Sequence, residues 1–376
     1  MMRYEIVGEP QSSVLAAVIQ DVPSGLPVRQ DAIDVDVARW ANASDCAEET
    51  PGIALRSGIA GGLTTGAPIL MTLDNGAYAQ ACARRVLKRS IACPGSVEAV
   101  GMQKYALDDS DILEYRAAAR LDAMRVAAAG VAREFLADFG VDIISCVTRI
   151  GRAAVLSSPF EASKPPSQLD IETSSCRCPA FQATRSMEIE MARARVKGDT
   201  LGGEFELGVY GLVSGLGSLC REGDALSARM AQATFSIEGI SGVEFGRAGR
   251  HELSGFDAHD ALRLDANGEL SRETNKAGGL EGGVSTGMPL VMRAHVVAPE
   301  RLGRDVASID METFEEGSYR APSFSCCDVP AKAIVAESEA AFVLARAYRA
   351  KFGGDSMGDI RASVAAYRAR LERAVR

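Results

Sequence analysis

Two arginines, Arg116 and Arg120, stand where they could hold an anion. They lie four residues apart in an alanine-rich stretch that predicts a helix over 113–140, so they share one helical face. Because a helix rich in alanine is expected to pack closely inside the protein, two guanidinium groups on it could bind a small anionic substrate. The pair could equally be structural and bond to Asp111, Asp122 or backbone carbonyls. Both interpretations stay open at the level of the sequence.

The residues that commonly bind metals do not form a local set. The nine cysteines are scattered, and the two close pairs, Cys176/Cys178 and Cys326/Cys327, lack the spacing of a zinc site. The three histidines are too far apart to supply neighbouring ligands. We therefore predict no metal, and we interpret the cysteines as reduced and mostly apolar in role, as in cytoplasmic proteins.

Composition and charge exclude several classes of protein. The chain has 376 residues, of which 47% are hydrophobic and 24% charged, which are ordinary values for a folded protein. Its net charge of −9 and pI of about 5.1 argue against a nucleic-acid partner. No signal peptide and no apolar run of membrane-spanning length are present, so we expect a cytoplasmic protein with no membrane association.

One glycine-rich segment occurs twice. GIAGGLTTGAPILM at 58–71 matches GLEGGVSTGMPLVM at 279–292 with a constant offset of 221 residues. Each copy reads as a glycine turn followed by a short apolar strand. Two copies in register predict an internally duplicated fold, in which residues 1–376 form a single domain with pseudo-symmetric halves.

The elements that would position these residues mix helices and strands. Apolar spacing predicts helices over 113–140 and 331–351 and a C-terminal helix within 355–376. Strand patterns occur at 143–148 and 204–210, and residues 157–183 are expected to form a long mobile loop. The pattern favours an α/β (α+β) fold with antiparallel strands rather than a repeating βαβ series.

Ordered motifs along nearly the whole chain resemble the chorismate synthase family. GEPQS at 8–12 stands at the family's Gly-Glu-Ser-His-Gly, and CPGSVE at 93–98 stands at its Arg-Pro-Gly-His-Ala-Asp. RAAAR at 116–120 resembles Arg-Ser-Ser-Ala-Arg, and GVEFG at 242–246 resembles Gly-Val-Glu-Ile-Gly. TNKAGG at 274–279, which leads into the second glycine block, resembles Thr-Asn-His-Ala-Gly-Gly.

The resemblance implies a fold and a reaction. The family fold has central helices sandwiched between two antiparallel four-stranded sheets, usually assembled as a tetramer. The family reaction eliminates phosphate from 5-enolpyruvylshikimate 3-phosphate to give chorismate and needs reduced FMN. Two histidines act as acids, and an aspartate assists removal of a proton.

The family's catalytic positions hold different residues here. The resemblance aligns the two histidines with Gln11 and Ser96, and the aspartate with Pro322. None of these side chains exchanges a proton near neutral pH. We therefore expect the family reaction to be altered or impaired.

The positions that bind the flavin and the substrate in the family are also changed. By resemblance, the FMN positions are Arg116, Ala117, Ala118, Glu238, Gly239, Gly282, Ala298 and Arg320, and the substrate anion would meet Arg116, Arg120 and Arg39. Two hydroxyl groups and a lysine of the family are absent at Ala117, Ala118 and Ala298. Glu238 and Glu300 add negative charge. We expect FMN to bind weakly or not at all.

Three hypotheses fit these observations. The chain could be a chorismate synthase with a divergent site. It could be another enzyme on the same scaffold, with Arg116, Arg120 and Arg320 holding a small anion and Glu238, Glu300 or Cys326 supplying chemistry. It could also be a catalytically silent paralogue that acts as a partner or regulatory subunit. A homotetramer or a hetero-oligomer with a paralogue is expected.

Overall fold

The computed structural model describes residues 2–8, 12–44, 52–75, 89–110, 113, 120–161, 165–264 and 270–373, with Arg120 and Arg373 described by their backbone alone. Helices and antiparallel strands alternate along the chain, which confirms the predicted α/β class. Among the described helices, none is both long and apolar enough to cross a membrane.

The first sheet has four antiparallel strands. Its spatial order is β1 (Arg3–Val7), β2 (Val14–Gln20), β6 (Ile69–Asp74) and β3 (Ile53–Ser57). Apolar side chains alternate along the two inner strands, and one face of the sheet is therefore buried. The buried residues on this face include Leu15, Ala17, Ile19, Ile69, Met71 and Leu73.

The second sheet repeats this order. The strands β7 (Asp142–Ile150), β9 (Gly203–Tyr210), β15 (Leu290–Val296) and β10 (Ile240–Phe245) lie side by side, and all pair antiparallel. A fifth strand of two residues, β8 (Ala153–Ala154), extends the sheet beyond β7. The expected pair of four-stranded sheets is present, and this short strand is an addition to it.

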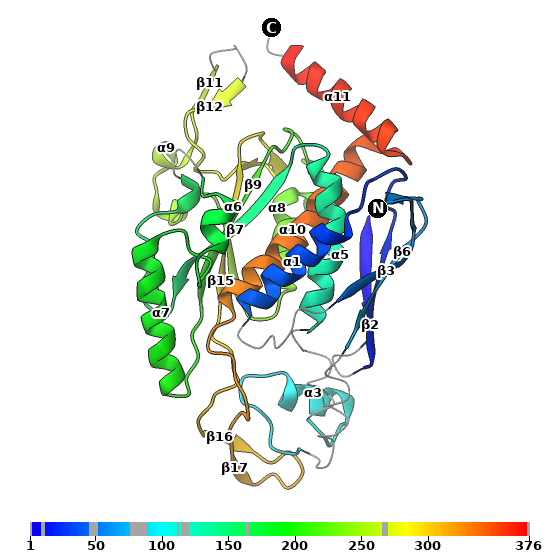
Figure 1. Cartoon of the computed structure of the whole chain (residues 1–376). Helices are drawn as coiled ribbons and strands as arrows, with labels where there is room; N and C mark the ends of the chain where they lie inside the picture. The colour runs from blue at the N-terminus through cyan, green and yellow to red at the C-terminus, as the bar shows by residue number, and fades with distance from the viewer. Residues whose placement is uncertain are drawn as a thin grey trace.

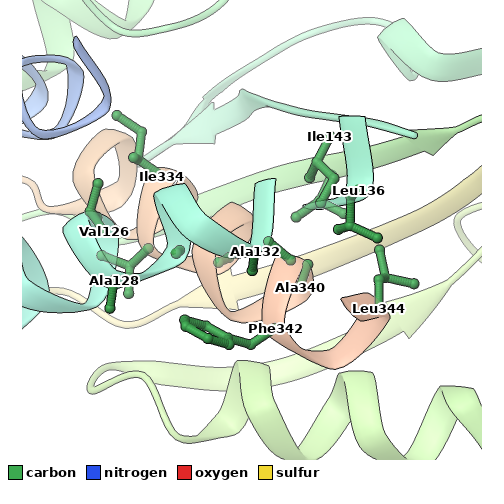
Figure 2. Packing of buried hydrophobic residues seen from close by; sticks show 14 of the residues in the cluster. Val126, Ala128, Ala132, Leu136, Ile143, Ile334, Ala340, Phe342 and Leu344 are labelled. Carbon is green, nitrogen blue, oxygen red and sulfur yellow. The ribbon is translucent and has the colours of Figure 1, made fainter. Parts of the chain in front are cut away.

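Long helices fill the space between the sheets (Figure 1). They are α1 (Gln30–Ala43), α5 (Arg120–Ala137) and α10 (Val329–Phe352), with α8 (Leu226–Phe235) packed on α10 and β10. Alanines at the contacts let α5 and α10 approach each other closely, as Figure 2 shows for Ala128, Ala132 and Ala340. Larger residues such as Leu136, Ile334 and Phe342 fill the remaining core.

The repeated glycine segments form matching hairpins. The first is β4 (Ile59–Ala60) with β5 (Leu63–Thr64), and the second is β13 (Leu280–Glu281) with β14 (Val284–Ser285). The paired glycines at their turns have nearly equal φ angles, +59° and +79° at Gly61 and Gly62, and +57° and +82° at Gly282 and Gly283.

The same side-chain hydrogen bonds hold both hairpins. The Thr64 hydroxyl donates to the Pro23 carbonyl at 2.5 Å and accepts from the Leu26 amide at 2.9 Å. The Ser285 hydroxyl donates to the Val213 carbonyl at 2.6 Å and accepts from the Leu216 amide at 2.9 Å. The two sequence blocks therefore form hairpins that are held in the same way, and the predicted pseudo-symmetry of the whole domain stays a prediction.

Smaller elements surround this core (Figure 1). A small lobe at the bottom of the view contains α3 (Glu98–Tyr105), β16 (Val306–Ile309) and β17 (Glu316–Tyr319). The outer helix α7 (Phe181–Val196), the hairpin of β11 (Leu262–Leu264) and β12 (Leu270–Arg272), and α11 (Met357–Arg373) lie on the periphery. The helix α11 occupies most of the segment 355–376 that was expected to be helical.

The segment 157–183 contains more regular structure than a loop. It holds a 3-10 turn, Pro159–Glu161, and the short helix α6 (Gln168–Glu172), which begins with a capping box between Ser167 and Asp170. Residues 162–164 lie outside the described part of the chain. The predicted mobility of this segment stays a prediction.

Candidate active site

Several of the predicted site positions meet where the small lobe joins the central helices. A buried apolar group of Cys93, Tyr319 and Ala321 packs the turn before α3 against the chain that follows β17. This contact brings Ser96 and the pair Arg320 and Pro322 into one lobe. The structure therefore gathers positions that are more than 200 residues apart in the sequence.

The turn before α3 uses both hydrogen-bonding roles of Ser96. The Ser96 hydroxyl donates to the Cys93 carbonyl oxygen at 2.8 Å and accepts from the Glu98 amide at 3.1 Å. This is an ordinary turn and helix-start arrangement. The hydroxyl has the geometry of a structural group and is not a proton donor near neutral pH.

A buried carboxylate anchors the same turn. Glu98 is 1% exposed, accepts a hydrogen bond from the Cys93 amide at 2.7 Å and pairs with the Arg301 guanidinium at 3.0 Å. Arg89 lies further away, with its Nη2 atom 4.0 Å from Glu98. Burial and the nearby Glu98 charge raise the pKa of the Cys93 thiol, so this cysteine stays protonated near neutral pH.

Arg320 and Pro322 are exposed on either side of the buried Ala321. The Arg320 guanidinium forms no ion pair with any residue in the described part of the chain. It can therefore reach a ligand with its charge intact. Pro322 carries no group that could donate or accept a proton in a reaction.

A largely buried polar group lies between β1, the described start of α5 and the first three turns of α10, and we call it the helix-start cluster: Tyr4, Asp122, Arg125, Lys332 and Glu339. The Lys332 ammonium lies 3.1 Å from the Asp122 carboxylate. Arg125 lies 3.7 Å from Asp122 and 3.8 Å from Glu339, and the Tyr4 hydroxyl donates to Glu339. Burial raises the pKa of Glu339, although Tyr4 and Arg125 oppose this effect.

Glu238 and Gly239 lie beside this cluster. The Glu238 side chain is partly open to water, yet desolvation on its protein side raises its pKa, which Lys332 opposes and Glu300 reinforces. The Gly239 carbonyl accepts from the Val297 amide at 2.9 Å, which places the predicted position Ala298 nearby. Carboxylates and the cations paired with them therefore surround the predicted cofactor positions Glu238, Gly239 and Ala298.

Arg39 lies elsewhere, inside the helical core. Its guanidinium pairs with Asp36 at 2.7 Å, Glu172 at 2.9 Å and Glu337 at 3.0 Å. Burial works against the charged form, but these three carboxylates outweigh burial and raise the pKa of Arg39. The arrangement favours a structural role for Arg39 over the predicted contact with a substrate.

Gly282 is also separate from the lobe within one chain. Its hairpin precedes β15, whereas Ala298 follows β15 at the opposite end of the strand. Since a strand rises about 3.3 Å per residue, these ends are roughly 20 Å apart. Gln11, Arg116, Ala117 and Ala118 lie outside the described residues, and for Arg120 only the backbone is described.

Sequence reasoning missed the helix-start cluster. The signal was present, because Lys332 and Glu339 are charged residues in the mostly apolar first half of α10. Charged residues that are buried in this way are paired or functional. Among the described residues, no three His, Cys, Asp or Glu side chains gather as metal ligands would.

Comparison with known proteins identifies the scaffold. The family model described as chorismate synthase matches residues 2–348. Over 393 aligned residues the chain is 36% identical to the chorismate synthase of Mycobacterium leprae (strain Br4923), with 98% of this chain and 95% of that protein covered. It is 34% identical to the chorismate synthase of Anaeromyxobacter dehalogenans (strain 2CP-C), with 98% and 99% covered.

A solved structure gives the same result. A crystal structure of chorismate synthase superposes with a TM-score of 0.81 and 26% sequence identity, covering 99% of this chain and 98% of the other. The match includes both sheets and the helices between them. The chain therefore belongs to the chorismate synthase family.

Proposed function

We propose that this protein binds a small anionic ligand between the small lobe and the starts of α5 and α10, and that it catalyses the family's phosphate elimination slowly or not at all. The full-length match to the family supports the scaffold. The observation that carries the proposal concerns the Ser96 hydroxyl, which both donates and accepts a hydrogen bond within its own turn.

Loss of proton transfer would have a large effect on the rate. General acid–base groups typically contribute about 10²–10⁴ each. The resemblance assigns such groups to three positions, which here hold Gln11, Ser96 and Pro322. Even one uncompensated loss would lower kcat by about two orders of magnitude.

The described residues at the family's flavin positions fit reduced FMN poorly. FMN brings a phosphate and an electron-rich ring, whereas this region presents the Glu238 carboxylate close to Glu300 and Asp122. Two cations near Glu238 already form ion pairs within the protein, because Lys332 pairs with Asp122 and Arg301 pairs with Glu98. The phosphate and ring of a bound flavin would lie close to these carboxylates, which disfavours an anionic cofactor of this size. The described residues therefore do not form a favourable site for the flavin.

Binding of a smaller anion is better supported. Arg320 is exposed on the lobe and makes no ion pair with the described residues, so its guanidinium can form a bidentate contact to a phosphate or carboxylate. The N-terminal end of α10, which begins at Val329, adds a favourable field for negative charge. Arg116 and Arg120 stay candidates for the same ligand on sequence grounds.

The proposal is tested by measuring formation of chorismate from 5-enolpyruvylshikimate 3-phosphate with reduced FMN under anaerobic conditions. The Mycobacterium leprae relative, at 36% identity, is assayed in parallel as the reference. We expect kcat/KM at least about 10²-fold below the reference. A rate within about tenfold of the reference would contradict the proposal, because it would show that other groups replace the lost acids.

A second readout tests ligand binding without turnover. Binding of 5-enolpyruvylshikimate 3-phosphate is measured by calorimetry for the unchanged protein and for Arg320→Gln, with Arg263→Gln on the exposed hairpin as a matched control. We expect Arg320→Gln to weaken binding by about tenfold or more, as loss of a charge-assisted contact does. Equal affinities for the two variants would remove Arg320 from the site.

A further inference from the structure

A second concave region lies at the other end of β10 from Glu238. Its cavity of about 390 Å³ is lined by Glu244, Phe245, Arg247, Arg250, His251 and Ala258. In Figure 1 this region is next to the short helix α9 (Gly255–Ala258), far from the small lobe at the bottom of the view. Because β10 has six residues, its two ends are roughly 20 Å apart.

The cavity concentrates positive charge in an acidic protein. Two guanidinium groups and the His251 imidazole line the cavity together with one carboxylate, Glu244, while the chain as a whole has a net charge of −9. Outside this lining, Asp260 and Glu281 are near enough to Arg250 for its charge to contribute to the lowering of their pKa values. The Glu244 carboxylate is itself 3.4 Å from the His295 Nε2 atom on β15. A local excess of cations around a concave surface favours an anionic ligand.

Arg250 is held in one orientation. It begins a 3-10 turn, Arg250–Glu252, and its Nε atom donates to the Ala258 carbonyl oxygen at 3.1 Å. That bond uses the Nε donor of the guanidinium and does not involve the two terminal nitrogens, which keep their donors. A guanidinium fixed in this way loses little freedom when it binds a phosphate or a carboxylate.

The loop that carries these arginines packs closely against the backbone at Lys276 and Ala277. A Cβ atom on Gly246, where φ is +79°, would lie only 2.1 Å from the Lys276 carbonyl oxygen. That oxygen accepts from the Arg247 amide at 3.0 Å. The Asp260 carboxylate accepts from the Lys276 and Ala277 amides at 2.7 and 2.9 Å. The backbone beneath the cavity is therefore fixed before any ligand binds.

The carboxylates around the arginines have their own partners. Asp260 is bonded to backbone amides and to Thr274, and Glu281 forms a two-point ion pair with Arg272 at 2.7 Å. Glu252, which is mostly exposed, lies 3.8 Å from His251. These groups stabilise the loop, and none of them forms an ion pair with Arg247 or Arg250 within the described part of the chain.

We propose that this cavity is a second anion-binding site, which takes a small metabolite bearing a phosphate or a carboxylate. Arg247 and Arg250 hold the anionic group, and Phe245 and Ala258 cover the apolar part of the ligand. The volume lies within the range of small-molecule sites. The proposal does not depend on the activity of the candidate active site.

The test uses two probes, phenyl phosphate and benzoate, which show whether the cavity binds a phosphate or a carboxylate. Each is titrated by calorimetry into the full-length protein, and the variant Arg250→Gln is compared with Arg263→Gln, an exposed arginine on the adjacent hairpin. We expect one probe to bind with a Kd at or below about 1 mM and Arg250→Gln to weaken it at least about tenfold. Arg263→Gln should leave the affinity unchanged.

Two further variants keep the result decisive. Since Arg250 also braces Ala258, Arg247→Gln removes the second guanidinium without touching that bond, and it should also weaken binding. Arg320→Gln is included to identify any binding of the same probe at the small lobe. The proposal is overturned if neither probe saturates, if both cavity variants bind as the unchanged protein does, or if only Arg320→Gln loses binding, which would assign the ion to the small lobe.

Discussion

Replacing Glu337 by glutamine should destabilise the protein strongly. Glu337 is fully buried at the centre of α10, and its carboxylate contacts Arg39 at 3.0 Å, Arg177 at 3.1 Å and Arg133 at 2.5 Å. The Ser145 amide and hydroxyl also donate to it, at 2.9 and 2.5 Å. Glu337→Gln keeps the shape of the side chain but leaves three buried cations without their common counter-charge.

Two estimates of the cost agree. Removing one partner of a buried ion pair typically costs about 3–5 kcal/mol. Burial disfavours the Glu337 carboxylate, but Arg39, Arg133 and Arg177 outweigh burial and lower its pKa from 4.5 to about 2. That shift corresponds to about 3 kcal/mol of stabilisation. For 376 residues, with about 2.1 cal/mol/K of unfolding entropy each, the expected loss in Tm is about 4–6 °C.

The assay is thermal unfolding followed by circular dichroism, at one protein concentration so that any oligomer is treated alike. Glu188→Gln serves as the matched control, because Glu188 makes a surface ion pair with Arg185 at 3.6 Å. We expect the control to lose no more than about 1 °C. Equal Tm values for the two variants would refute the view that the charged network holds α1, α5 and α10 together.

Three other perturbations follow from the same geometry. Because the pKa of Glu337 is lowered in the folded protein, its stabilising effect is present above about pH 4.5 and is lost as the pH falls towards about 2. Acid unfolding curves should show this loss of stability, and the loss should be absent in Glu337→Gln. Gly246→Ala would force a methyl group to 2.1 Å from a carbonyl oxygen and should lower stability by about 1–3 kcal/mol more than Gly61→Ala, which has open space, as urea unfolding would show. Among the described residues, Lys332→Met would leave the largely buried Asp122 with only Arg125 as an ion-pair partner, at 3.7 Å. The free energy of unfolding measured in urea should therefore fall by about 1–3 kcal/mol, and an unchanged value would show that this ion pair does not stabilise the protein.

Local sequence patterns predicted the elements of the fold well. The helix expected over 331–351 is α10, Val329–Phe352, and the strands expected at 143–148 and 204–210 are β7 and β9. These segments have strong apolar periodicity, which depends only on neighbouring residues. The repeated glycine blocks were equally informative, because a turn with positive φ restricts the residue types that it accepts.

The ion pairs were beyond sequence reasoning because their partners are distant in the chain. Arg39 and Glu337 are 298 residues apart, and their contact depends on how α1 packs on α10. The resemblance predicted Arg39 as a substrate contact, whereas in the structure neighbouring carboxylates form ion pairs with its guanidinium. Similarly, Arg177 lies in a segment expected to be a loop, yet it is 3% exposed and pairs with Glu172 and Glu337.

The functional roles of the candidate site residues stay predictions. The motifs pointed to Ser96, Glu238, Ala298 and Arg320, and the structure brings these regions to the junction of the lobe and the central helices. The sequence alone could not show that the Ser96 hydroxyl is hydrogen-bonded within its own turn or that Lys332 forms an ion pair with Asp122. These contacts decide which charges remain for a ligand.

The most direct test of the central claim is a titration of reduced FMN into the purified protein, with and without 5-enolpyruvylshikimate 3-phosphate. We expect no saturable binding below about 1 mM in either case, because Glu238 and its acidic neighbours disfavour an anionic cofactor. Saturable binding of FMN that tightens when the substrate is present would contradict the account and would show that the family's site is intact.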